Sequence, residues 1–66
     1  MKHQDQRARV PSKDQAIEIW IRILDGEFQH AIAADMGLNQ GRISEVKSRL
    51  RHPEAYDIAI KRVTKH

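Results

Sequence analysis

The stretch that decides the fold is FQHAIAADMGLNQGRISEVK, residues 28–47, in which two short helical patterns flank a glycine. In the first pattern, apolar side chains recur at Phe28, Ile32 and Met36, the spacing of one face of an α-helix. Gly37 follows directly, and glycine readily adopts the left-handed backbone that ends a helix. The pattern therefore predicts a short helix that ends at Met36 and begins at Phe28 or one residue before it.

The second pattern predicts a helix over about residues 40–51. Asn39 precedes it, and asparagine is a favoured N-cap because its side-chain oxygen accepts a hydrogen bond from a free backbone N–H. Pro53 marks the end, since a proline disfavours the helical conformation for the residue before it. The apolar stripe of this helix consists of Ile43, Val46 and Leu50.

Three positions within the stretch suit two helices that pack at a steep angle. Ala33 is small enough for a close crossing, Gly37 suits the turn, and Ile43 is a bulky apolar residue that would face the first helix. The remaining inward positions are apolar, namely Ile32, Met36, Leu38 and Val46. The outward positions are polar, namely Gln29, Asp35, Gln40, Arg42, Ser44, Glu45 and Lys47. An ordinary helical hairpin with a glycine turn is the alternative interpretation.

This combination resembles the helix-turn-helix family of bacterial and phage regulators, closely over residues 28–47. In that family, the first helix of the pair lies across the DNA backbone, and the second enters the major groove with its N-terminal residues at the base edges. The residues that the resemblance places at bases are Gln40, Gly41, Ser44 and Glu45, with Lys47 or Ser48 at the edge of reach.

The side chains of this second helix suggest specific contacts. Gln40 can pair bidentately with adenine. Gly41 would let the helix approach a base closely, or it is merely a tolerated residue that weakens the helix. Glu45 could accept a hydrogen bond from cytosine, or could hold Arg42 or Arg49 in place. The second role for Glu45 is favoured, because a carboxylate near phosphates is otherwise unfavourable.

Phosphate contacts are expected from the cations of the second helix and from the start of the first. They are Arg42, Lys47 and Arg49, with Gln29, while Arg51 and Lys61 are weaker candidates. Arg7 and Arg9 could enter a minor groove, or could belong to a disordered tail. The complete predicted DNA-binding set is Gln29, Asn39, Gln40, Gly41, Arg42, Ser44, Glu45, Lys47, Ser48 and Arg49.

The flanking sequence predicts two further helices. Ser12 and Gln15 have the spacing of a capping box, which predicts a helix over residues 13–24 that Gly26 closes. Pro53 suits the first turn of a last helix over residues 54–64.

We therefore expect an all-α domain of three to four helices over residues 11–66, after a flexible basic arm over residues 1–10. The apolar arc of the helix over residues 13–24 is wider than one core requires. Its surplus residues are Ala16, Ile19 and Ile23. They would be covered either by a second copy of the chain, in a homodimer, or by the last helix folding back on its own chain. We favour the homodimer.

Composition narrows the class of protein. The 66 residues contain no cysteine, which excludes disulfides and thiolate metal sites. No apolar run approaches the roughly 20 residues of a membrane span, and the N-terminus lacks the apolar core of a signal peptide. The four histidines lack metal-ligand spacing, the serines lack triad partners, and no glycine loop could cradle a phosphate. We expect a cytoplasmic protein that is not an enzyme and has no metal, cofactor or small-molecule ligand.

The charge pattern favours a polyanionic partner. The formal net charge is +3, and its positive part is concentrated after Gly37, where residues 39–51 carry four cations against one anion. The sequence thus predicts a sequence-specific, double-stranded DNA-binding transcriptional regulator, a repressor that occludes a promoter as a homodimer on an inverted repeat. The alternatives are a protein-interaction module that inhibits another regulator, and a DNA-architectural or recombination-directing factor of a mobile element.

Overall fold

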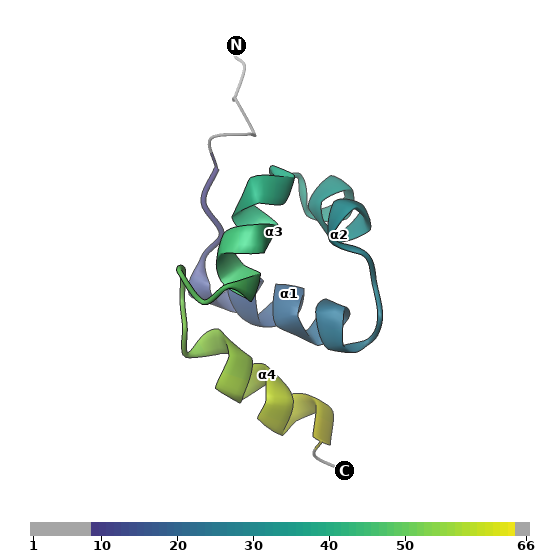
Figure 1. The fold of residues 1–66 in the computed structure, drawn as a ribbon. Coiled ribbons are helices and arrows are strands. Elements are labelled where there is room, and N and C mark those ends of the chain that lie inside the picture. Colours follow the sequence, from purple (N-terminus) through teal and green to yellow (C-terminus); the bar gives the residue numbers. More distant parts are fainter. Residues whose placement is uncertain (1–8, 65–66) are drawn as a thin grey trace.

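The computed structural model describes residues 9–64, in which the chain forms four α-helices and no strand (Figure 1). In chain order the helices are α1 (Lys13–Leu24), α2 (Gln29–Met36), α3 (Gln40–Lys47) and α4 (Ala55–Thr64). The predicted all-α fold with four helices is confirmed. The predicted arm over residues 1–10 lies outside the described residues except for Arg9 and Val10, which are exposed and belong to no helix.

Helix α1 has the bounds and the caps that its sequence predicts. The Ser12 hydroxyl accepts a hydrogen bond from the Gln15 amide at 3.2 Å, and the Ser12 amide donates to the Gln15 side chain at 2.9 Å. Two of the four free amides of the first turn are thereby satisfied. At the other end, Gly26 adopts a left-handed conformation with φ +93° and closes the helix.

Helices α2 and α3 are joined by a three-residue turn with the predicted glycine at its start and the predicted asparagine cap at its end. Gly37 is left-handed with φ 69°, and the amides of Gly37 and Leu38 both donate to the Ala33 carbonyl. The Asn39 side chain accepts from the Gly41 amide at 2.7 Å and so caps α3. Ala33 and Ile43 are both buried, as expected for the positions where two helices meet.

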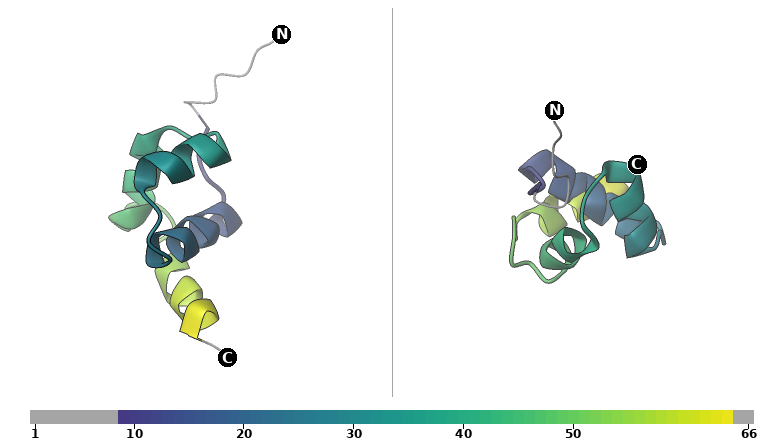
Figure 2. Two further views of the ribbon diagram at one scale, coloured as in Figure 1. Left: turned by 90° about the vertical axis from the view of Figure 1, so that its right-hand side faces the viewer. Right: turned by 90° about the horizontal axis from the view of Figure 1, so that it is seen from above.

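Helix α1 lies at the centre of the fold, with α2 and α3 on one side and α4 on the other (Figures 1 and 2). Ala16 and Ile19 are fully buried, as are Ala55 and Ala59 on α4. The small side chains of α4 let it pack closely against α1. Helix α4 thus folds back on its own chain and covers most of the surplus arc, which was the alternative to a dimer. The homodimer itself stays a prediction.

Helix α3 is shorter than the predicted helix over residues 40–51. Helix α3 ends at Lys47, not at residue 51, because Arg49 adopts a left-handed conformation with φ 68°. The amides of Arg49 and Leu50 donate back to the carbonyls of Val46 and Glu45, which closes the helix in a Schellman turn. Leu50 is therefore turned outward and is 81% exposed, so its predicted place in the apolar stripe is wrong.

Phe28 also departs from the predicted pattern. It stands one residue before α2 with an extended backbone, and its side chain is 72% exposed. Its ring stacks on His30 at a centroid distance of 5.8 Å rather than entering the core. The inward side of α2 therefore consists of Ile32, Ala33 and half-buried Met36.

None of the described helices is both long and apolar enough to cross a membrane.

Candidate nucleic-acid interface

Helix α3 presents a polar, uncharged ridge to solvent. Gln40, Gly41, Ser44 and Ser48 are all exposed. The opposite side of the helix is anchored in the core by Ile43 and Val46, both fully buried. Since residues three and four apart share one helix face, this alternation fixes the ridge outward. The ridge contains four of the ten residues predicted to bind DNA.

One flank of the ridge faces α2. The Ser44 hydroxyl donates a hydrogen bond to the Gln29 side chain at 3.1 Å, which joins the start of α2 to the middle of α3. Beside it lies an open groove of about 340 Å³, lined by Gln29, Gln40 and Lys47 together with Ile23, Glu27, Phe28 and His30. The fold therefore brings Gln29, Ser44 and Lys47, which the sequence named as one site, onto neighbouring positions.

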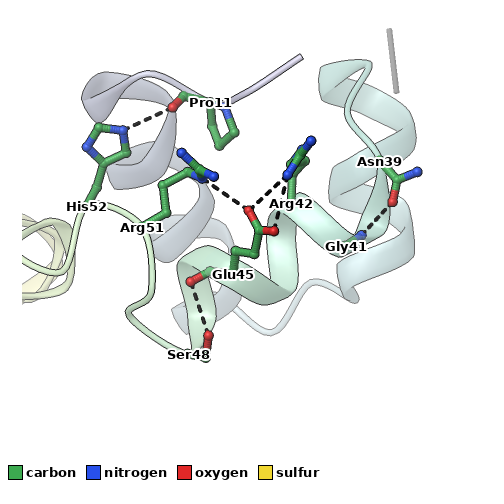
Figure 3. Close-up of polar contacts among 8 residues, drawn as sticks. All are labelled: Pro11, Asn39, Gly41, Arg42, Glu45, Ser48, Arg51 and His52. Carbon is green, nitrogen blue, oxygen red and sulfur yellow. Dashed lines mark hydrogen bonds and ion pairs between the residues drawn. The ribbon is translucent and has the colours of Figure 1, made fainter. Parts of the chain in front are cut away.

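The other flank carries a carboxylate shared by two arginines (Figure 3). The Arg42 guanidinium lies 3.2 and 3.3 Å from the two oxygens of Glu45, and Nε of Arg51 lies 3.1 Å from one of them. The hydrogen bond from Arg51, and then that from Arg42, lowers the pKa of Glu45 below its ordinary value. Of the roles considered for Glu45, the contact with Arg42 is present, but the second partner is Arg51.

Arg49 points elsewhere. Its guanidinium lies over the ring of Tyr56 at 4.2 Å and is 5.9 Å from the ring of Trp20. A cation over an aromatic face is attracted by the ring quadrupole, so Arg49 contributes to the contact between the loop after α3 and the α1–α4 layer. This geometry separates Arg49 from the other predicted phosphate contacts.

Arg51 is the residue that sequence reasoning undervalued. It lies six positions after Glu45, a spacing that no helix-face rule pairs, and the two meet only because Arg49 reverses the chain. His52 fixes the far side of this loop, since its ring lies 3.0 Å from the Pro11 carbonyl. The contact could not be predicted because it depends on a left-handed backbone at position 49. Glycine or asparagine would have indicated that conformation, but the residue there is arginine.

Asn39 and Gly41 are coupled at the start of α3. A Cβ placed on Gly41 would lie 3.1 Å from the Asn39 side-chain oxygen, so glycine leaves room for the cap. This gives Gly41 a role inside the protein that neither sequence interpretation considered.

Alanine at position 41 is expected to stabilise the chain more when the cap is absent. Gly41→Ala should gain up to about 1 kcal/mol of helix propensity, offset by displacement of a cap worth about 1 kcal/mol. In an Asn39→Gly background the offset disappears. Urea unfolding of the two single variants and the double variant gives the coupling. Additive effects would show that Asn39 and Gly41 do not interact.

The described residues contain no group of three His, Cys, Asp or Glu side chains that could hold a metal ion. Comparisons of the chain with protein-family models, with curated proteins and with solved structures found no match. The site is therefore interpreted from its own geometry.

Proposed function

We propose that the chain is a sequence-specific, double-stranded DNA-binding transcriptional regulator that inserts α3 into the major groove. One observation carries the proposal: an exposed, uncharged, hydrogen-bonding ridge stands between two flanks that each carry cations. Base edges in the major groove offer hydrogen-bonding groups, whereas the phosphates on both sides of the groove attract positive charge. A chain with this surface can repress transcription by occluding a promoter.

The residues divide by their place on α3. Gln40, Gly41, Ser44 and Ser48 on the ridge would face bases, and Lys47 and Gln29 on the α2 flank would contact phosphates. Asn39 would act indirectly, because its oxygen is already engaged by the Gly41 amide. Glu45 would act through its arginine partners rather than by reading a base.

A homodimer on an inverted repeat completes the proposal. The apolar residues Ile21, Leu24 and Val63 line an open hollow of about 640 Å³ where α1 and α4 end. The hollow is also lined by Glu18 and Arg22 of α1 and by Asp25 and Glu27 in the turn that follows. A second copy could therefore cover these apolar side chains. Two recognition helices would then meet successive major grooves, about 34 Å apart.

A second candidate function is supported by two exposed apolar side chains near the ridge. Phe28 lines the groove beside α3, Leu50 follows α3 in the chain, and both are largely solvent-exposed. Large apolar side chains in clusters are typical of protein-binding surfaces, although isolated ones are common on any protein. The corresponding function is a protein-interaction module that inhibits another regulator.

Selection of bound duplexes from random DNA, at two salt concentrations, separates these functions. An enriched inverted repeat supports a dimeric regulator, and a single half-site supports a monomeric one. Salt-sensitive binding without a motif would favour a DNA-architectural factor instead. Absence of binding at low salt would overturn the DNA proposal and favour the protein-interaction module.

A matched pair of lysine variants tests the placement of the site. Lys47→Gln should weaken binding to all duplexes and reduce the slope of log affinity against log salt by about 0.9, the value of one phosphate contact. Lys61→Gln makes the same charge change on α4 and should leave the slope unchanged. A slope that falls for Lys61→Gln and not for Lys47→Gln would show that α3 is not the DNA-binding helix. Fluorescence anisotropy with a labelled duplex gives both slopes.

A further inference from the structure

The cluster of Arg42, Glu45 and Arg51 carries one more cation than it needs for internal pairing. One carboxylate accepts from two guanidinium groups, so the cluster has a net charge of +1. Arg22 shows the opposite arrangement, because it is bound by Glu27 at 2.8 Å and by Asp35 at 2.6 Å. Arg22 therefore contacts two carboxylates, so its charge is more than balanced. In the cluster beside α3, two arginines share one carboxylate, and the remaining positive charge can attract an external anion.

Glu45 holds Arg51 through both its backbone and its side chain. The Glu45 carbonyl accepts from the amides of Leu50 at 3.0 Å and Arg51 at 3.3 Å. Its carboxylate accepts from Nε of Arg51, and the two terminal nitrogens of that guanidinium form no hydrogen bond with the described residues. About a third of each of the two arginine side chains is exposed. The donors are therefore oriented before a ligand arrives.

The Arg42 side chain is held by partial burial and by its bond to Glu45. Its Nε is buried without a hydrogen-bond partner among the described residues, and one terminal nitrogen is bound to Glu45. Its remaining terminal nitrogen lies on the same flank of α3 as Arg51 (Figure 3). Two oriented guanidinium groups around one carboxylate match the oxygens of a phosphodiester, which guanidinium groups bind through paired hydrogen bonds.

We propose that Arg42 and Arg51 form a binding site for a DNA backbone phosphate, with Glu45 as the residue that positions both. The inference rests on the proposed function and adds Arg51 to its contacts in place of Arg49. Phosphates would then be bound on both flanks of the ridge, by Gln29 and Lys47 on one side and by this arginine pair on the other. Two such contacts fix how deeply and at what angle α3 enters the groove.

Arg51→Gln and Arg49→Gln provide the matched test, since both remove one positive charge from the same loop. With the duplex selected by the wild-type chain, Arg51→Gln should reduce the salt slope by about 0.9. Its affinity would then fall about 8-fold less than that of the wild type for each tenfold rise in salt. Arg49→Gln should leave the slope unchanged and lower Tm instead, because it loses its contact with Tyr56.

Glu45→Gln separates positioning from a merely structural role. The variant gains net positive charge, so its affinity for random-sequence duplex should rise. Its preference for the selected duplex over random duplex should fall several-fold, because the arginines are no longer oriented. A structural role alone would lower both affinities together.

Three outcomes have distinct meanings. If the wild-type chain binds no DNA at low salt, the proposed function itself fails. If it binds, but the slope changes for Arg49→Gln and not for Arg51→Gln, only the arginine site is overturned. Inorganic phosphate at matched ionic strength tests the remaining source of the anion. A rise in Tm that is lost in Arg51→Gln, together with an unchanged salt slope for DNA binding by that variant, would assign the site to a free anion and overturn DNA as its ligand.

Discussion

Replacing Ile43 with alanine is expected to lower the free energy of unfolding by about 2–5 kcal/mol, the usual cost of truncating a buried aliphatic side chain. Ile43 is fully buried, and it lies where α3 packs on the rest of the fold. A domain of this size has a total stability of only about 3–5 kcal/mol from its single core. The variant should therefore be largely unfolded at 25 °C, with loss of helical circular dichroism.

Leu50→Ala is the matched control, because its side chain is aliphatic, of the same size, and 81% exposed. Its free energy of unfolding should stay within about 0.5 kcal/mol of the wild type. The milder Ile43→Val, expected to cost about 0.5–1.5 kcal/mol, keeps the comparison measurable by urea unfolding. A larger loss for Leu50→Ala than for Ile43→Val would mean that α3 continues past Lys47 and buries Leu50.

The contrast between Ile43 and Leu50 shows which parts of α3 helical periodicity predicts correctly: the burial of Ile43 within the helix, but not the exposure of Leu50 beyond its end. Caps and turns depend on neighbours in the chain, so Ser12 with Gln15, Gly37 and Asn39 could each be assigned from a few letters. Those local signals set the starts of α1 and α3 and the turn before α3. The end of α3 depends instead on contacts outside the helix, with Tyr56 of α4 and Trp20 of α1.

Arg49 illustrates how contacts outside the helix determine where α3 ends. Nothing local requires it to be left-handed, but that conformation places its guanidinium over Tyr56 of α4 and brings Arg51 back to Glu45. A left-handed conformation costs a side-chain-bearing residue about 1–2 kcal/mol, which surrounding contacts must offset. Helical periodicity extended past Lys47 therefore predicted the wrong neighbours for both Leu50 and Glu45.

The solvent-exposed face of α3 was easier to predict than the end of the helix. Within α3, the buried pair Ile43 and Val46 fixes which side chains face solvent, and that follows from periodicity alone. The flanks required the fold, because Gln29 reaches Ser44 from α2 and Arg51 reaches Glu45 from a loop. The same holds for the surplus apolar arc of α1, because the sequence alone does not show that α4 packs on α1 and buries Ala16 and Ile19.

Gln40 is expected to determine preference at one base pair of each half-site. It is the first residue of α3, it is exposed on the ridge, and its amide can donate to N7 and accept from N6 of one adenine. Gln40→Ala should remove about 1–3 kcal/mol of discrimination at that position, a loss of about 5- to 150-fold in preference. Affinity for the other positions of the site should keep its ranking.

The measurement is a repeat of the random-duplex selection with the variant, followed by affinities for duplexes that differ only at the affected base pair. Lys47→Gln is the informative comparison, because loss of a phosphate contact should weaken all of these duplexes by the same factor. If Gln40→Ala also weakens all duplexes evenly, Gln40 contacts the backbone rather than a base. The ridge would then lie against phosphates, and α3 would not be the helix that reads the major groove.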